Sequence, residues 1–417
     1  MHPLLYIIFA IIIFEALWDF FLGELNRKSW SDKVPKRLED VYPQDKFQKQ
    51  KEYRIANYRF GLFSSAVSTI LILMVLWYQG FGWLHYTVEN FIGHKYLQPL
   101  VYFGAIGLGS MILSLPFSIY STFVIEERFG FNRTTKSTFI TDLIKSLLLG
   151  ALIGGLLLWL VVWFYHTAGS LFWLYAWGGL SLFMIFFSKF YTTLILPLFN
   201  KLTPLEEGEL KSAIESMSRK AGFSLENVYV MDGSKRSTKA NAFFSGFGEN
   251  KRIVLFDTLI NDLDKDEIVA VLAHEIGHYR LKHTIRGTIL GILQTGITLF
   301  LLGWFINHPG ISQALGVASP VFHVALLGFG LLYSPISAMA GLGMTILSRR
   351  QEYQADAFAA KYANASALQS ALKKISATAL NNPTPHPWFV FFNYSHPPLL
   401  KRLEALDSFT SVKPTIK

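Results

Sequence analysis

Two histidines and a glutamate stand close together in the string His274-Glu275-Ile276-Gly277-His278. If this stretch is helical, the spacing of four places both imidazoles on one face, one turn apart, where they can share a tetrahedral zinc ion. Glu275 lies beside them and can accept a proton from a zinc-activated water. The alternative is that the string occurs by chance, but its helical surroundings argue against that. The string therefore predicts a hydrolytic zinc site.

A catalytic zinc site needs a third protein ligand and one open position. Candidates occur in Glu352-Tyr353-Gln354-Ala355-Asp356, where two carboxylates are again four residues apart and fall on one predicted helical face. Glu352 could complete the ligand set, and Asp356 could orient a ligand histidine. The alternative is a solvated helix face without a metal. Beside the histidine motif, this pattern favours one Zn²⁺ per chain.

The composition predicts that these residues belong to a membrane protein. Of the 417 residues, 51% are hydrophobic and only 16% are charged, whereas average soluble domains have about 25% charged residues. A disordered chain is excluded by the same numbers. The net charge of +9 comes without a nucleic-acid recognition motif, so we expect basic loops facing membrane lipid and no nucleic-acid partner. The absence of cysteine excludes disulfides and thiolate ligands.

Seven stretches are long and apolar enough to cross a membrane: residues 3–22, 60–84, 100–124, 146–165, 171–198, 287–306 and 321–346. Lys189 and Pro197 interrupt the fifth stretch, which predicts a break, a tilt or an interior-facing polar side chain there. The first stretch is interpreted as a retained span rather than a signal peptide. It has no basic region before it, and Glu15 and Asp19 interrupt it.

The distribution of Lys and Arg predicts which side of the membrane each loop occupies. The segments after spans one and three are rich in both, whereas those after spans two, four and six contain only Lys95. The odd-numbered loops are therefore predicted to be cytoplasmic, with the amino terminus outside. The segments that carry the two motifs, residues 199–286 and 347–417, then share the cytoplasmic side.

The segment between spans five and six has the pattern of a small α+β region. A polar helix is predicted over residues 204–221 and short strands over 227–231, 242–247 and 252–256. A helix over residues 264–283 carries the histidine motif. The predicted organisation is spans one to five in residues 1–198, a catalytic segment in 199–286, spans six and seven in 287–346, and a tail with the third ligand in 347–417.

The two motifs together resemble the type 1 CAAX prenyl protease family of integral-membrane, gluzincin-like HExxH zinc metallopeptidases. Residues 123–132, 196–200, 237–243 and 395–398 also fit this family, and the resemblance covers nearly the whole chain. It implies an all-α polytopic membrane protein in which seven transmembrane helices form a barrel around a water-filled chamber. A small α+β zinc metallopeptidase region would lie on the cytoplasmic side.

The resemblance also implies roles for individual residues. His274, His278 and Glu352 are the expected zinc ligands, and Glu275 is the expected catalytic base and acid. Asp356 is expected behind the ligands, where it would orient a histidine.

One strand segment and two single side chains are expected to contact substrate. Asn241, Ala242 and Phe243 would form an edge strand that aligns the peptide by β-augmentation, the alternative being an ordinary hydrophobic strand. His396 would be a second catalytic group that donates to the oxyanion, the alternative being a turn residue before two prolines. Arg402 would bind a substrate carboxylate, the alternative being an ion pair with a neighbouring acid.

The predicted function is a zinc metalloendopeptidase that hydrolyses peptide bonds near the C-terminus of prenylated CAAX-type substrates within a membrane chamber. One alternative is a quality-control peptidase that cleaves unprenylated membrane proteins. Another is a metal-ion transporter, which would place such residues along the spans rather than at their margins. The expected partners are a peptide or protein substrate and membrane lipid. The sequence favours a bacterial inner membrane, with the endoplasmic reticulum membrane as the eukaryotic alternative.

Overall fold

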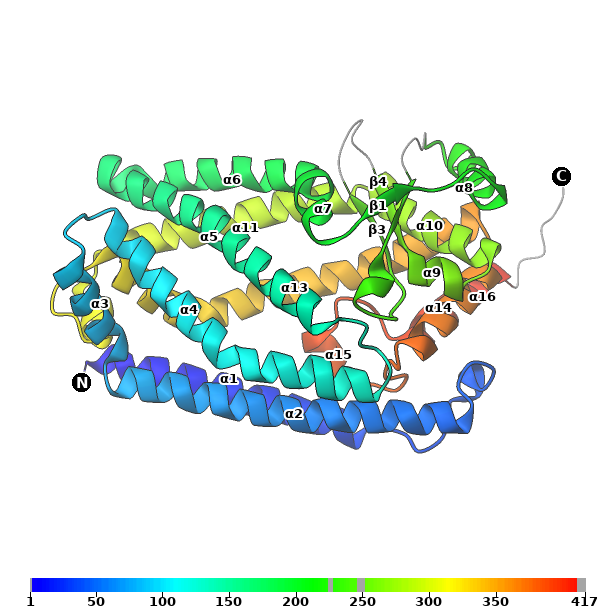
Figure 1. The fold of residues 1–417 in the computed structure, drawn as a ribbon, viewed down its shortest axis with the longest axis horizontal. Coiled ribbons are helices and arrows are strands. Elements are labelled where there is room, and N and C mark those ends of the chain that lie inside the picture. The colour runs from blue at the N-terminus through cyan, green and yellow to red at the C-terminus, as the bar shows by residue number, and fades with distance from the viewer. Residues whose placement is uncertain (1, 224–227, 246–251, 411–417) are drawn as a thin grey trace.

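The computed structural model describes residues 2–223, 228–245 and 252–410. Within these ranges, seven helices are long and apolar enough to cross a membrane, as predicted. They are built on α1 (Pro3–Lys28), α2 (Gln44–Trp77), α4 (Leu97–Tyr120), α5 (Lys136–Thr167), α6 (Phe172–Phe190), α11 (His283–Phe305) and α13 (Phe322–Tyr362). These helices run roughly along the long axis of the molecule, and the small sheet lies at one end (Figure 1).

The seven helices form a closed ring. The order of contacts runs from α1 to α2, to α4 with its extension η2 (Ser121–Glu126), and then through α5, α6, α11 and α13 back to α1. Only 6% to 22% of the most apolar window of each helix is buried. A packed bundle would bury one face of every helix. The helices therefore surround a hollow, and the predicted barrel is confirmed.

Two spans contain π-helical turns in the described part of the chain. One is η2, and the other is η4 (Tyr191–Ile195), which separates α6 from α7 (Leu196–Phe199). The fifth span is therefore continuous but irregular near Lys189 and Pro197, with Pro197 in the first turn of α7, where its missing N–H costs nothing. The second span ends earlier than predicted, because Gln79 with φ of 54° turns the chain into α3 (Gly80–Phe91).

The described strands form one four-stranded sheet in the order β1-β2-β4-β3. Strands β2 (Val228–Met231) and β4 (Arg252–Phe256) pair in parallel, whereas β1 (Leu202–Pro204) and β3 (Ala242–Ser245) add antiparallel at the two edges. Strand β1 was not predicted. Residues 227, 246 and 247 of the predicted strands lie outside the described residues.

Further helices lie outside the seven spans, towards the end that carries the sheet. They are α8 (Glu209–Lys220), α9 (Asp257–Asp262), α10 (Lys265–Arg280), α14 (Ala365–Thr378), α15 (Pro387–Asn393) and α16 (Leu399–Thr410). One hydrophobic core joins the sheet to α8, α10, α14 and α16 through fully buried side chains such as Ile214, Ile253, Leu272, Ala371 and Leu406. Helix α13 runs without a break from the membrane ring into this region, across the predicted boundary at residue 346.

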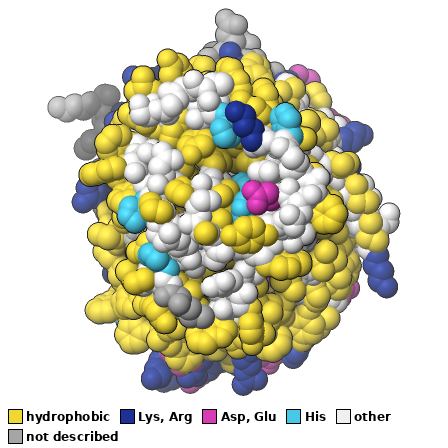
Figure 2. All heavy atoms as spheres, turned by 90° about the vertical axis from the view of Figure 1, so that its left-hand side faces the viewer, with side chains coloured by type: hydrophobic (Ala, Val, Ile, Leu, Met, Phe, Trp, Pro, Cys, Tyr) yellow, Lys and Arg dark blue, Asp and Glu magenta, His cyan; other side chains and the backbone are white. Residues whose placement is uncertain are grey.

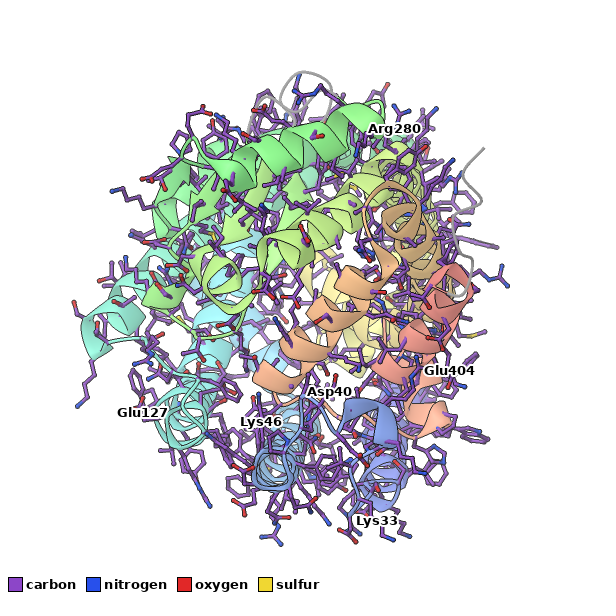
Figure 3. All side chains as sticks on the ribbon, turned by 90° about the vertical axis from the view of Figure 1, so that its right-hand side faces the viewer. Lys33, Asp40, Lys46, Glu127, Arg280 and Glu404 are labelled. Atoms are coloured by element: carbon purple, nitrogen blue, oxygen red, sulfur yellow. The ribbon has the colours of Figure 1, made fainter. Side chains whose placement is uncertain are left out.

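Segments that are far apart in the sequence meet at the end that carries the sheet. Arg37, between α1 and α2, pairs with Asp407 of α16 at 2.7 Å, and Glu126 of η2 pairs with Lys239 at 2.9 Å. Figure 3 labels charged side chains at this end, and they come from the segment between α1 and α2, the first turn of α2, the residue after η2, α10 and α16. At the opposite end, hydrophobic side chains cover most of the flanks (Figure 2). The loops after spans one and three therefore share one end with both motif-bearing segments.

Candidate metal centre between helices α10 and α13

Local sequence fixes the start of α10, the helix that carries the histidine motif. Asp264 and Glu267 form a capping box, in which the Asp264 N–H donates to the Glu267 carboxylate at 2.9 Å. Glu267 also accepts from Ser370 at 2.6 Å and from Lys374 at 2.8 Å, so α14 is attached to the same turn. The first turn of α10 is therefore fixed by these contacts, and the apolar face of the following turns packs on the sheet.

A close approach of two helices brings the third candidate ligand to the histidines. A Cβ added to Gly277 would lie 3.2 Å from the Cα of Ala355 and 3.1 Å from the Cβ of Phe358. Small residues at this crossing let the backbones of α10 and α13 nearly touch. Glu352 lies one turn before Ala355 on α13 and faces His274 and His278.

Three candidate ligand side chains converge at this crossing. The Nε2 atoms of His274 and His278 are 3.1 Å apart. Glu352 Oε2 lies 3.5 Å from His274 Nε2, and Glu352 Oε1 lies 3.3 Å from His278 Nε2. His274 and Glu352 are buried, and His278 is partly exposed. The site therefore has one side open to solvent.

The three side chains fit a bound metal ion. Atoms about 2.0–2.1 Å from one tetrahedral ion lie roughly 3.3 Å from each other, close to the three distances observed. Glu352 Oε2 is buried and accepts no hydrogen bond within the described residues. The Arg402 guanidinium lies 3.4 Å from this oxygen but makes no hydrogen bond to it, and a bound metal ion would satisfy the buried oxygen. These residues form the one group of histidines and carboxylates in the described part of the chain that could hold a metal.

Outer contacts fix the orientation of both histidines. His274 Nδ1 lies 2.9 Å from Asp356 Oδ1, and His278 Nδ1 lies 3.1 Å from His283 Nδ1. His283 in turn lies 3.0 Å from Gln354 Oε1. Each histidine thus keeps Nε2 directed at the shared site while its Nδ1 is held elsewhere.

Sequence reasoning missed His283 and Gln354. Lys282, with φ of 60°, turns the chain between α10 and α11 and folds His283 back towards His278. A left-handed lysine is uncommon and leaves no clear pattern in the sequence. The presence of a third histidine five residues after His278 was the only available signal.

Glu275 is partly exposed beside the ligands, and no described side chain donates a hydrogen bond to its carboxylate. Desolvation raises the pKa of Glu275 above its ordinary value, and the neighbouring Glu352 carboxylate raises it further, while His274 and His278 oppose the shift. The carboxyl group is therefore free to exchange a proton with a molecule that enters the site.

His396 reaches the site from the loop between α15 and α16. Its Nε2 lies 3.4 Å from Glu352 Oε1, and its side chain is 64% exposed. Ser395 Oγ lies 2.9 Å from His396 Nδ1. If the serine hydroxyl donates, the imidazole carries its proton on Nε2, on the side of the metal site.

Arg402 of α16 has a carboxylate partner within the protein. Its Nη2 and Nε donate to the two oxygens of Asp356 at 2.6 and 2.9 Å, and Nη1 lies 3.4 Å from Glu352 Oε2. Burial lowers the pKa of Arg402, but the Asp356 carboxylate raises it by more, so the side chain stays charged. This ion pair is the alternative that the sequence left open for Arg402, and it places the residue behind His274.

Asn241, Ala242 and Phe243 lie at the start of the outermost strand. The N–H of Phe256 donates to the carbonyl of Asn241 at 3.0 Å, and β3 pairs with β4 from Ala242 onward. No other described strand covers the opposite edge of β3. Strand β3 also contacts α10, which carries the histidines. The predicted segment therefore has the placement that an added strand requires.

Comparisons with known proteins show which family this chain belongs to. Residues 25–201 match the family described as CAAX prenyl protease N-terminal, five membrane helices, and residues 204–410 match peptidase family M48. The chain belongs to the CAAX prenyl proteases of family M48. The CAAX prenyl protease 1 homolog of Mus musculus is 34% identical over 450 residues, covering 96% of this chain and 95% of the relative. CAAX prenyl protease 1 of Saccharomyces cerevisiae is 35% identical over 408 residues, covering 91% and 90%.

A solved structure extends the likeness to the fold. The crystal structure of S. mikatae Ste24p matches with a TM-score of 0.92 and 34% identity, covering 98% of this chain and 100% of that chain. The predicted family and fold are thus confirmed, and this member of the family is a multi-pass membrane metallopeptidase. The alternative of a metal-ion transporter is set aside.

Proposed function

We propose that this protein is a zinc endopeptidase that cleaves CAAX-type substrates near their C-terminus, with His274, His278 and Glu352 as the zinc ligands. The observation that carries the proposal is the convergence of two imidazole nitrogens on a buried carboxylate whose Oε2 accepts no hydrogen bond from any described residue. Two histidines and one glutamate are a donor set typical of catalytic zinc. The substrate class is taken from the relatives, which are named CAAX prenyl proteases.

Zinc at this site would polarise the scissile carbonyl and lower the pKa of a bound water. Glu275 would accept a proton from the attacking water and then deliver it to the leaving amine, because no side chain in the described ranges donates a hydrogen bond to its carboxylate. His396 would donate from Nε2 to the developing oxyanion. Asp356 and His283 act as positioning residues, since each contacts the Nδ1 atom of a ligand histidine.

The substrate would add to the free edge of β3 as an extended strand. Backbone pairing aligns a peptide without requiring a particular sequence. Within the predicted segment of Asn241, Ala242 and Phe243, the main chain of Ala242 would face the peptide, because that of Asn241 and Phe243 faces β4. Arg402 would hold His274 through Asp356.

The positive-inside pattern supports an active site on the cytoplasmic face, because the basic loops and both motif-bearing segments share one end. We also retain the bacterial inner membrane as the host membrane. The expected partners are a prenylated peptide or protein and membrane lipid, with no nucleic acid.

The test of this function is cleavage by the purified protein of a farnesylated C-a-a-X peptide beside the same peptide without the lipid. Cleavage that needs the lipid and is lost in Glu275→Gln is the expected result. Equal cleavage of both peptides that still needs Glu275 would contradict the prenylated substrate and favour general membrane-protein proteolysis. Cleavage that survives Glu275→Gln would contradict the assigned mechanism.

A further inference from the structure

A cavity of about 430 Å³ lies directly beside the candidate metal centre. His396 and Arg402 form part of its wall, and α14 with the loop before α15 forms the opposite part. Its size is in the range of small-ligand pockets. The lining combines apolar side chains, such as Leu372 and Ile375, with polar ones, such as Asn382. The cavity therefore suits a short peptide with aliphatic side chains and a polar end.

Arg54 of α2 brings a cation to this cavity. Its Nε donates to the carbonyl of Leu380 at 3.2 Å, and its Nη2 donates to Asn381 Oδ1 at 3.3 Å. Both acceptors are uncharged, and no described carboxylate pairs with Arg54. Arg402, the other arginine of the cavity, is already paired with Asp356 at 2.6 Å. Arg54 is thus the arginine in this cavity whose charge lacks a partner among the described residues.

The proposed reaction supplies a matching anion. If cleavage removes the last three residues of a C-a-a-X chain, the bound substrate has its free C-terminal carboxylate on the third residue after the scissile bond. Three extended residues span about 10 Å, so this carboxylate lies within about 10 Å of the scissile bond. The cavity begins within that reach, because His396 and Arg402, which lie beside the metal centre, form part of its wall. The two substrate residues that precede X in C-a-a-X are aliphatic, and Leu372 and Ile375 give the cavity wall an apolar surface for them.

We propose that Arg54 binds the free C-terminal carboxylate of the substrate and that the 430 Å³ cavity holds the departing tripeptide. This inference rests on the proposed function. Arginine is suited to the role because its planar guanidinium can donate two parallel hydrogen bonds to a carboxylate. The enzyme would therefore select for a free C-terminus. A peptide that ends in a free carboxylate would be a better substrate than the same peptide with its carboxylate blocked.

The test compares two farnesylated C-a-a-X peptides that differ only at the C-terminus, one a free acid and the other a primary amide. Wild-type protein is expected to cleave the acid with a kcat/KM roughly 10- to 100-fold higher, the size of a charge-assisted hydrogen-bond pair. In Arg54→Gln the acid-to-amide ratio should fall close to one. Arg54→Lys, which keeps the positive charge but cannot donate two parallel hydrogen bonds, should give an intermediate ratio.

The acid-to-amide ratio of kcat/KM distinguishes substrate binding by Arg54 from a purely structural role of Arg54. Because Arg54 also holds the Leu380 carbonyl, its loss could loosen the loop after α14, but that would slow both peptides alike. Arg59→Gln is the matched control, since Arg59 lies on the same helix and lines a different cavity. It should keep the wild-type ratio.

Each outcome decides between the two proposals. A wild-type ratio near one, or an Arg54→Gln protein that keeps the wild-type ratio, would overturn the role of Arg54 while leaving the proposed function intact. A wild-type protein that cleaves neither peptide would overturn the proposed function and the carboxylate site with it.

Discussion

Gly277 of α10 and Ala355 of α13 lie in direct contact, so that a Cβ on Gly277 would stand 3.2 Å from the Cα of Ala355. This contact sets the separation of the two helices that carry the candidate ligands. Because His274, His278 and Glu352 lie within one turn of it, the geometry of the metal site depends on the absence of a side chain at residue 277.

Gly277→Ala is therefore expected to weaken metal binding and lower stability. Alanine gains about 1 kcal/mol of helix propensity over glycine, but overpacking of a close contact costs about 1–3 kcal/mol. Gly287→Ala on α11 is the control, because nothing lies within 4 Å of its added Cβ. Zinc affinity and thermal unfolding of both variants would be measured. Equal behaviour of the two variants would contradict the role of the helix contact.

His283 is expected to support metal binding through His278. Replacing His283 by Ala removes the contact at 3.1 Å that holds His278 Nδ1. Loss of such an outer contact commonly costs 10- to 100-fold in metal affinity or activity. Zinc affinity is measured by competition with a chelator, and kcat is measured at saturating zinc. His308→Ala, three residues beyond the far end of α11, is the control. Unchanged zinc affinity and kcat in His283→Ala would show that His283 does not position His278.

The free edge of β3 gives a prediction about the backbone. Phe256 donates to the carbonyl of Asn241, so these two residues form a hydrogen-bonded pair between β3 and β4. Such pairs alternate with non-hydrogen-bonded ones along an antiparallel ladder. Phe244, three residues after Asn241, therefore directs its N–H away from β4. Phe244→Pro should remove a donor to the substrate and leave the sheet pairing intact. Peptide cleavage by this variant is expected to fall at least tenfold below that of Phe244→Ala, which loses the same ring and keeps the N–H.

The two strand variants must also retain zinc, because the prediction concerns substrate alignment alone. A Phe244→Pro protein that binds zinc and cleaves as well as Phe244→Ala would contradict β-augmentation at this edge.

Local patterns predicted the parts of the site that lie on single elements. The spacing of His274 and His278, and that of Glu352 and Asp356, follows from helical periodicity. The seven spans follow from hydropathy in the same way. What could not be predicted depends on contacts between distant segments. The place of β3 at the sheet edge follows from the parallel pairing of β2 with β4, which no local pattern encodes.

The sequence left an ion pair open for Arg402 but could not name its partner, and the place of His283 was not predicted. Arg402 pairs with Asp356 only because α16 folds against α13. His283 returns to His278 only through the left-handed turn at Lys282. In each case a residue acts through the orientation of a neighbour, and its type alone does not show which neighbour that is.

The central claim is that His274, His278 and Glu352 hold zinc while Glu275 moves the proton. It is tested most directly by measuring zinc content and peptide cleavage on the same purified samples of wild type, Glu275→Gln and His278→Ala. We predict about one zinc per chain in wild type and Glu275→Gln, with cleavage nearly abolished in Glu275→Gln. His278→Ala should lose zinc and cleavage together, and chelation of the wild type should stop cleavage until zinc is restored. Full zinc content and full activity in His278→Ala, or normal turnover in Glu275→Gln, would contradict the account.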